Sequence, residues 1–205
     1  PIAQAIWGGS AVGYPNGILR TLRAMATRSH GKLTPGTRAG IKLAAHLARP
    51  SQGPAKLHHA HVLVDWATAI WKDLVPWQEQ EAAYNGAMAR LAKARRPWGV
   101  AAGPTAVYLL TLKRLGWYPI SFNEIMTYRG LRLDLYRIAP KALRPLAHEA
   151  TQRWTDIQDT DCPRLGTPGF QIFWPALSTS LRKAKASEDW TQRHIDTLRF
   201  ILAGG

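Results

Sequence analysis

The sequence predicts a mainly α-helical fold: a bundle-like array of about seven helices with one small β-hairpin near residues 125–136. Apolar residues recur at three- and four-residue spacing along much of the chain, which is typical of helices packed on a core. Residues 105–115 (TAVYLLTLKRL) are apolar nearly all round, whereas residues 131–135 (LRLDL) alternate as a strand does. With 205 residues, 46% of them hydrophobic, the chain is long enough to bury a core.

Apolar stripes locate the individual helices. In the basic N-terminal part, Ile18, Leu22, Met25 and Ala26 are expected to face inward. Further helices are expected around residues 63–74, 84–92 and 143–157, and a last one over 188–202. Their stripes are Leu63, Trp66, Ala67, Ile70, Trp71 and Leu74; then Tyr84, Ala87, Met88, Leu91 and Ala92; then Leu143, Ala147, Ala150, Trp154 and Ile157.

The segment 105–115 is expected to be the central buried helix. Gly116 follows it, and glycine readily adopts the left-handed conformation that ends a helix. Residues 121–124 (SFNE) have the S-x-x-E form of a capping box, which predicts that a short helix begins there. The hairpin is expected to follow that helix.

Composition restricts the domain organisation and the compartment. The Pro- and Gly-containing stretch 50–56 (PSQGPAK) suggests a division into a basic helical arm, residues 1–56, and a helical body, residues 57–205. Cys162 is the single cysteine, so an internal disulfide is excluded and a reducing, intracellular location is expected, in nucleus or cytoplasm. No apolar run reaches the roughly 18–20 residues that span a bilayer, and no membrane association is expected. Because the chain starts at Pro1 without Met, we expect it to be a fragment of a longer protein.

Charge is distributed very unevenly. The net charge is +14, yet residues 1–64 contain no Asp or Glu while they contain eight Lys and Arg. A strongly positive protein attracts polyanions, and Lys and Arg that contact phosphates give affinity without reading sequence. We therefore expect RNA or DNA backbone to be the partner. The predicted phosphate contacts are Arg20, Arg23, Arg28, Lys32, Arg38, Lys42 and Arg49, with Arg95 and Arg96 as second choices.

Candidate catalytic and metal sites are weak. His58, His59 and His61 could bind zinc only with further converging ligands, and we interpret them as histidines beside solvent near the start of a helix. The pair Asp159 and Asp161 lacks a third carboxylate nearby. Phosphate-loop, dinucleotide-binding and H-E-x-x-H motifs are absent from the sequence. We predict no catalytic residue, no metal site and no cofactor.

Several stretches carry a family resemblance: residues 5–15 (AIWGGSAVGYP) before a basic helix, 103–117 (GPTAVYLLTLKRLGW), 130–135 (GLRLDL) and 202–205 (LAGG). Together they resemble the thumb and post-palm region of reverse transcriptases of non-LTR (LINE-like) retrotransposons, as in dinoflagellate element-derived open reading frames. The catalytic aspartates of that family, in their F/Y-x-D-D setting, have no counterpart in this sequence.

The resemblance implies a non-catalytic region that grips template RNA and primer DNA, with a polymerase core upstream in the same parent chain. Two alternatives remain open. One is a helical scaffold or protein-interaction module whose basic arm binds an acidic protein. The other is a small helical hydrolase that uses the histidine group at residues 58–61.

Overall fold

The structure is a computed structural model that describes residues 8–28 and 53–160 of the chain. The chain divides into two compact units. One comprises residues 1–19 and 55–154, and it is called the body below; the other comprises residues 20–54 and 155–205. The predicted boundary between residues 56 and 57 stays a prediction, and the expected helix over 188–202 lies outside the described residues.

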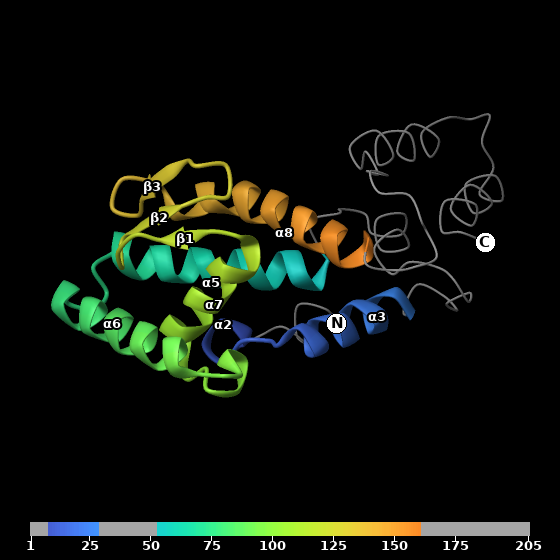
Figure 1. Cartoon of the computed structure of the whole chain (residues 1–205). Coiled ribbons are helices and arrows are strands. Elements are labelled where there is room, and N and C mark those ends of the chain that lie inside the picture. Colours follow the sequence, from blue (N-terminus) through green and yellow to red (C-terminus); the bar gives the residue numbers. More distant parts are fainter. Residues whose placement is uncertain (1–7, 29–52, 161–205) are drawn as a thin grey trace, which may run out of the picture. The chain divides into compact units, whose positions relative to one another are not determined.

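The described residues confirm the mainly helical class with a small antiparallel sheet (Figure 1). The α-helices are α2 (Gly9–Val12), α3 (Asn16–Arg28), α5 (Pro54–Trp71), α6 (Trp77–Lys93), α7 (Gly103–Leu115) and α8 (Leu143–Thr160). Short 3-10 helices are η2 (Pro97–Gly99) and η3 (Pro140–Ala142), and the strands are β1 (Tyr118–Pro119), β2 (Glu124–Met126) and β3 (Arg132–Asp134).

Helix α7 is the central buried helix, as predicted. Eight of its thirteen residues are buried, and α2 and α6 both pack against it. On another side of α7, the ring of Tyr108 stacks on Trp66 of α5 with a centroid distance of 4.8 Å. Burying each such large side chain stabilises the fold by about 1.5–3 kcal/mol relative to leaving it exposed. The body is therefore built around α7.

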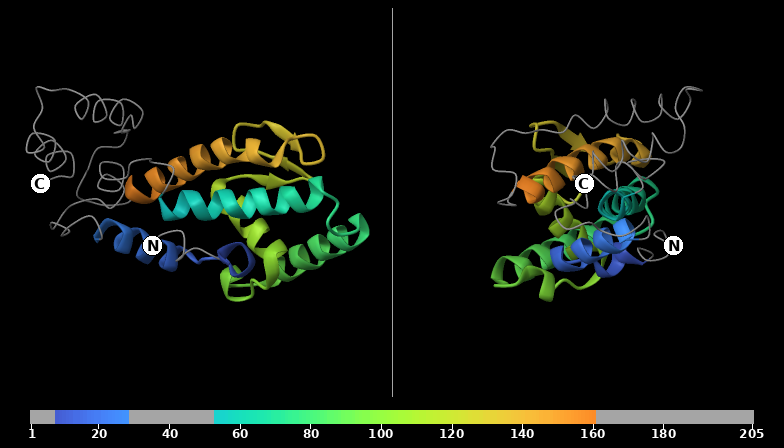
Figure 2. Two further views of the ribbon diagram at one scale, coloured as in Figure 1. Left: turned by 180° about the vertical axis from the view of Figure 1, so that it is seen from behind. Right: turned by 90° about the vertical axis from the view of Figure 1, so that its right-hand side faces the viewer.

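Helices α5 and α8 lie side by side in Figure 1 and in both views of Figure 2. The predicted apolar stripe of α8 supplies Leu143, Ala147 and Ala150 to the core. Near the middle of the pair, His59 of α5 and Thr151 of α8 are hydrogen-bonded. The two helices thus form one layer of the body, joined by apolar packing and a buried polar contact.

The end of α7 follows the prediction for Gly116. This glycine has φ +72°, the amide of Trp117 donates to the Leu112 carbonyl at 2.9 Å, and the amide of Gly116 donates to Lys113. These bonds occupy carbonyls that the helix end would otherwise leave unpaired. The turn aims the chain into β1.

The predicted hairpin is present, and a third strand accompanies it. Strand order is β1-β2-β3, all antiparallel, with Ile125 opposite Leu133. Both of these side chains are buried, whereas their neighbours along each strand are more exposed. This alternation buries one face of the sheet in the body.

The predicted short helix at residues 121–124 is wrong. The hydroxyl of Ser121 does accept the Glu124 amide at 3.1 Å, as in a capping box. The Glu124 side chain, however, pairs with Arg132 across the sheet instead of returning to the Ser121 amide. The Phe122 carbonyl accepts the indole N–H of Trp66, which holds this segment as the loop between β1 and β2.

Four predicted apolar faces are wrong in part, since Met88 of α6 is 40% exposed and Ile157 of α8 is 49% exposed, and the faces of α5 and α3 also differ. Helix α5 ends at Trp71 because Asp73 takes a left-handed φ of +48°, so Trp71 and Leu74 are 45% and 63% exposed rather than in the core. In α3, Ile18 and Met25 are exposed, while Leu19 and Ala26 are buried. Among the described helices, none is both long and apolar enough to cross a membrane.

Candidate nucleic-acid interface

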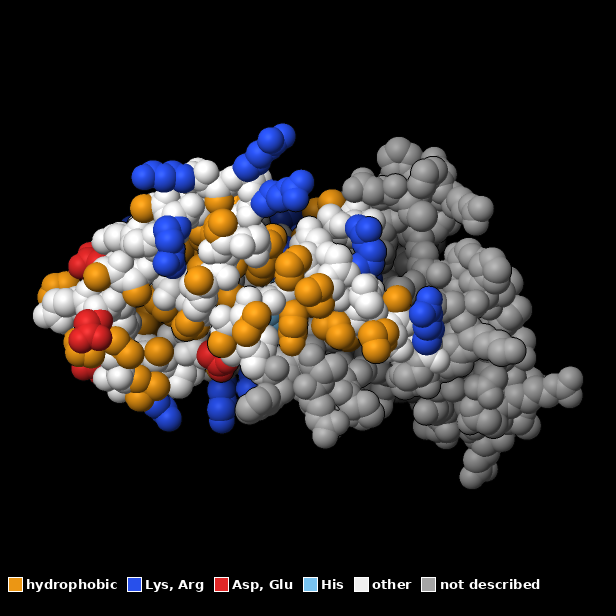
Figure 3. Space-filling model, turned by 90° about the horizontal axis from the view of Figure 1, so that it is seen from below, with side chains coloured by type: hydrophobic (Ala, Val, Ile, Leu, Met, Phe, Trp, Pro, Cys, Tyr) orange, Lys and Arg blue, Asp and Glu red, His pale blue; other side chains and the backbone are white. Residues whose placement is uncertain are grey.

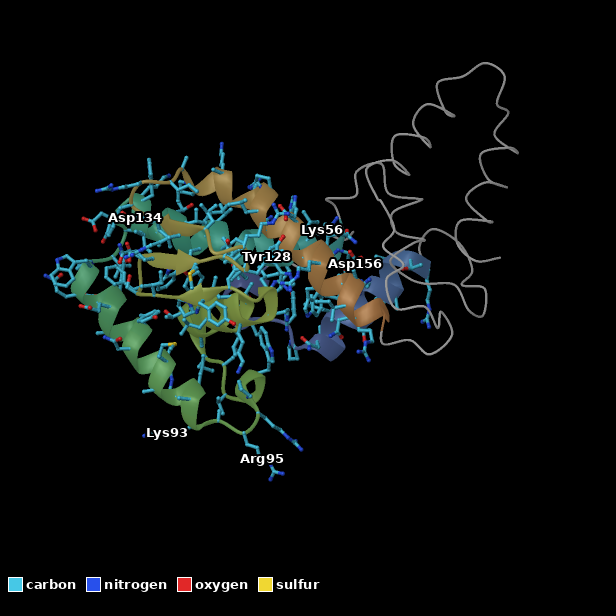
Figure 4. All side chains as sticks on the ribbon, turned by 45° about the horizontal axis from the view of Figure 1, so that its top comes forward. Lys56, Lys93, Arg95, Tyr128, Asp134 and Asp156 are labelled. Atoms are coloured by element: carbon cyan, nitrogen blue, oxygen red, sulfur yellow. The ribbon has the colours of Figure 1, made fainter. Side chains whose placement is uncertain are left out.

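The second-choice arginines lie in an exposed basic segment of the body. Arg90 and Lys93 occupy the last turn of α6, and Arg95 and Arg96 follow it directly. All four are exposed, and none forms an ion pair with a described residue. Lys93 and Arg95 project outward from this end of α6 in Figure 4. We call these four residues the α6-end cations.

Local structure explains why the cations gather there and point outward. Tyr84, Ala87 and Leu91 turn the apolar side of α6 toward the core, which leaves positions 90 and 93 on the opposite side. Cations also suit the last turn of a helix, because the unpaired carbonyls there carry partial negative charge.

The loop that carries Arg95 and Arg96 is anchored. The carbonyl of Arg96 accepts the Gly99 amide at 2.9 Å, which forms the turn of η2. Two residues after Arg96, the indole of Trp98 lies beneath the guanidinium of Arg114, 4.2 Å from the ring centroid to Cζ. The two arginines therefore extend from a loop fixed by its neighbours.

Next to the α6-end cations lies a pocket of about 400 Å³ between α6, η2, α7 and β1. Its lining is mostly apolar, and Lys113 is its only charged member. Lys113 is exposed and, like the α6-end cations, forms no ion pair with a described residue. One exposed cation, Lys113, thus lines the apolar pocket, and two more, Arg95 and Arg96, directly precede its lining residue Pro97 in the chain.

Acidic side chains are concentrated elsewhere in the body. Glu79 and Glu81 lie in the first turns of α6, at the opposite end from Lys93. In Figure 3, Asp and Glu side chains (red) lie mainly toward the left end of the face shown, and Lys and Arg (blue) extend from several other places. Helix α6 is therefore acidic at its start and basic at its end.

The first-choice residues are described only in part. Arg20 and Arg28 of α3 are exposed, Arg23 is half-buried, and α3 contains no acidic residue. Lys32, Arg38, Lys42 and Arg49 lie outside the described residues. The structure thus leaves the predicted surface of the basic arm untested.

The interpretation of His58 and His59 as histidines beside solvent is wrong. They are 1% and 0% exposed, and only His61 of the group is exposed. The reason is that α5 is apolar nearly all round, so residues 58 and 59 face the core from its first turns. Within the described ranges, no group of three or more His, Cys, Asp or Glu side chains could hold a metal ion.

These histidines belong to a buried basic cluster around Arg114, which sequence reasoning missed. We call Arg114, His58, His59, Trp98 and Trp154 the Arg114 cluster. Its guanidinium packs on both indoles, 4.2 Å from the centroid of Trp98 and 5.4 Å from that of Trp154. The arginine lies at the end of an apolar helix, where a terminal cation usually reaches solvent, so no local pattern signals that it is half-buried.

Hydrogen bonds fix the protonation of His59. The hydroxyl of Thr151 donates to the Ala147 carbonyl, so it accepts from Nδ1–H of His59 at 2.9 Å. The other ring nitrogen, Nε2, accepts from Nη1 of Arg114 at 3.1 Å, and Nη2 donates to the Tyr14 carbonyl at 2.7 Å. His59 is therefore neutral, and burial together with the Arg114 charge lowers its pKa well below the ordinary value.

His58 is neutral for similar reasons. Burial, followed by the charges of Arg114 and His61, lowers its pKa to about 3. Neither of its ring nitrogens has a hydrogen-bond partner among the described residues. Burial also lowers the pKa of Arg114 to about 10, so the guanidinium stays charged at neutral pH. The cluster thus holds a single positive charge between two indoles, and it supports the η2 loop from beneath.

No protein-family model, curated protein or solved structure matches this chain. The resemblance to retrotransposon reverse transcriptases therefore stays a prediction based on a few short stretches of sequence.

Proposed function

We propose that this chain is a non-catalytic module that binds nucleic acid without reading its sequence. The observation that carries the proposal is the group of four exposed α6-end cations, two in the last turn of α6 and two on the anchored loop after it, which form no ion pair with a described residue. Lys and Arg in this state are available for phosphate, since no described carboxylate competes for them.

The acid-free sequence of residues 1–64 supports the same proposal. Within it, α3 presents Arg20 and Arg28 to solvent without an acidic residue in the helix. Each phosphate contact releases condensed counterions, so several weakly placed cations together give useful affinity. These cations would bind the charge of the phosphate backbone and would not distinguish one base from another.

The sequence resemblance suggests where such a module would act. We propose that it is the thumb and post-palm region of a retroelement reverse transcriptase, which holds RNA template and DNA primer beside a polymerase core elsewhere in the parent chain. The coding sequence upstream of Pro1 tests this part. A polymerase core with the F/Y-x-D-D aspartates supports it, and an unrelated domain refutes it.

The rival is a scaffold that uses the same cations to bind an acidic protein. Fluorescence anisotropy with a 20-base-pair DNA and an RNA duplex of equal length, at low salt, separates the two. A poly-glutamate peptide of matched charge serves as competitor. Nucleic-acid binding that the peptide displaces only weakly supports the proposal, and binding to the peptide alone supports the rival.

The variant Arg95→Glu/Arg96→Glu tests the interface itself. We expect it to weaken duplex binding by at least tenfold at low salt, since two attractive charges become repulsive. Its matched control is Lys72→Glu/Lys141→Glu, which reverses two exposed lysines elsewhere in the body. An equal loss in both variants would show that only net charge matters and would contradict an interface at the end of α6.

A further inference from the structure

We propose that the pocket between α6, η2, α7 and β1 takes one unstacked base of a single-stranded nucleic acid, while Lys113, Arg95 and Arg96 hold the flanking phosphates. This inference rests on the proposed function and names the form of nucleic acid that this surface favours. Its evidence is the combination of an apolar pocket and three exposed cations that form no ion pair with a described residue: Lys113 in the lining, and Arg95 and Arg96 directly before the lining residue Pro97.

The cavity has the size and chemistry for a base. Its volume of about 400 Å³ lies in the range of small-molecule pockets and exceeds what one base fills. Met88, Leu91 and Ala92 line it from α6, and Leu109 and Leu110 line it from α7. Base faces are apolar and stack on aliphatic and aromatic side chains alike, so this lining accepts any base.

The charges around the cavity match the backbone on either side of an inserted base. Lys113 belongs to the lining, and Pro97, which also lines the pocket, directly follows Arg95 and Arg96. These three cations are exposed and form no ion pair with a described residue. An apolar protein side chain could fill the cavity too, but its neighbours would need acidic groups, whereas every nucleotide brings its own phosphate.

The geometry predicts a preference for single strands. In a duplex the bases are paired and stacked, so extruding one would cost the energy of unpairing and unstacking it. In a single strand a base can leave the stack at much lower cost. Duplexes would therefore use the cations alone, and single strands would use the cations and the pocket.

The test compares three labelled probes of equal nucleotide number in anisotropy titrations of the full chain: a 12-nucleotide DNA single strand, the same strand with every base removed, and a six-base-pair duplex. We expect the base-bearing strand to bind about 5- to 100-fold more tightly than the abasic strand, the range of one stacked base. Equal affinities for these two strands would overturn the inference, while binding of the abasic strand and the duplex would still support the proposed function.

Two variants of α6 locate the effect. Ala92→Phe fills the pocket, and Ala89→Phe places the same ring on an exposed position of α6 outside the lining. We expect Ala92→Phe to remove the preference for the base-bearing strand while its abasic-strand affinity stays unchanged, and Ala89→Phe to keep both. If both variants behave like the parent chain, the pocket is not the site and the inference fails.

The charged rim is tested in the same way. Lys113→Ala should weaken all three probes, and Lys113→Arg should restore them, because both cations can hold phosphate. The matched control Lys141→Ala removes an exposed lysine distant in sequence from the pocket. A circular dichroism spectrum of each variant confirms that it is folded. No binding of any probe by the folded parent chain would overturn the proposed function and the inference together.

Discussion

Nη1 of Arg114 donates to Nε2 of His59 over 3.1 Å, and Arg114 forms no ion pair with a carboxylate of the described residues. The arginine is instead held by the Tyr14 carbonyl and by the faces of Trp98 and Trp154. A half-buried cation held by neutral groups ties together α7, α5, α8 and the segment after α2. Its surroundings give the first two predictions.

Replacing Arg114 should destabilise the body. In Arg114→Met, Nε2 of His59 and the Tyr14 carbonyl lose their donor. Each unsatisfied buried acceptor costs about 1–3 kcal/mol, so we expect the free energy of unfolding to fall by about 2–4 kcal/mol in urea titrations. Lys113→Met replaces the exposed neighbour of Arg114 and should change the free energy of unfolding by less than about 0.5 kcal/mol. Similar values for both variants would show that the bonds of Arg114 contribute little.

Stability should fall as the pH is lowered below about 6.5, the ordinary histidine pKa. The folded-state pKa of His58 is lowered to about 3, and that of His59 is lowered well below its ordinary value. Between the folded-state and the unfolded-state pKa of each histidine, the unfolded chain binds a proton that the folded chain does not, so acid favours unfolding. The expected slope is about 1.4 kcal/mol per pH unit for each histidine, most clearly measured between pH 6 and 5, above the range of ordinary carboxyl groups.

A matched pair of variants assigns that slope. His58→Leu removes a buried titrating group whose ring nitrogens have no described partner, so it should lower the slope by about 1.4 kcal/mol per pH unit and cost little at pH 7. His61→Leu removes an exposed histidine of the same helix and should leave most of the slope intact. Urea titrations at several pH values measure both. An unchanged slope in His58→Leu would contradict its assignment as a neutral buried histidine.

Replacing each of two glycines by alanine should change the stability of the fold in opposite directions. Gly116 has φ +72°, and an added Cβ would meet its nearest neighbour at 3.5 Å, so Gly116→Ala costs backbone strain of about 1 kcal/mol rather than a clash. Gly86 lies inside α6 with nothing within 4 Å of an added Cβ, so Gly86→Ala should stabilise by about 0.5–1 kcal/mol. Thermal unfolding of both variants measures the two changes in stability. A change in the same direction in both variants would contradict the left-handed conformation of Gly116 or the helical conformation of Gly86.

The sequence was informative where several local rules agreed with one another. The segment 105–115 is apolar nearly all round and ends at Gly116, which predicted the central helix and its C-terminal turn. The alternation of Leu131, Leu133 and Leu135 likewise predicted the hairpin. In these segments helix or strand period, burial and turn chemistry agree.

Prediction failed where tertiary contacts decided between two local possibilities. The S-x-x-E pattern at Ser121 makes the same first hydrogen bond in a helix cap and in this loop, and only Arg132 and Trp66 decide which one forms. His58 and His59 are polar by type, yet α5 is covered on most sides. Arg95 and Arg96 could be selected from the sequence, but the pocket beside them unites residues from α6, α7 and β1, which no local pattern reveals.

The central claim is that the cations at the end of α6 bind phosphates, and a salt series of duplex binding tests it most directly. For the parent chain we predict a log–log slope of about −4 or steeper, which corresponds to several phosphates held. Arg95→Glu/Arg96→Glu should make the slope shallower by about 2, since roughly 0.9 is lost for each phosphate contact. An unchanged slope in that variant, or no binding at low salt by a folded parent chain, would contradict the account.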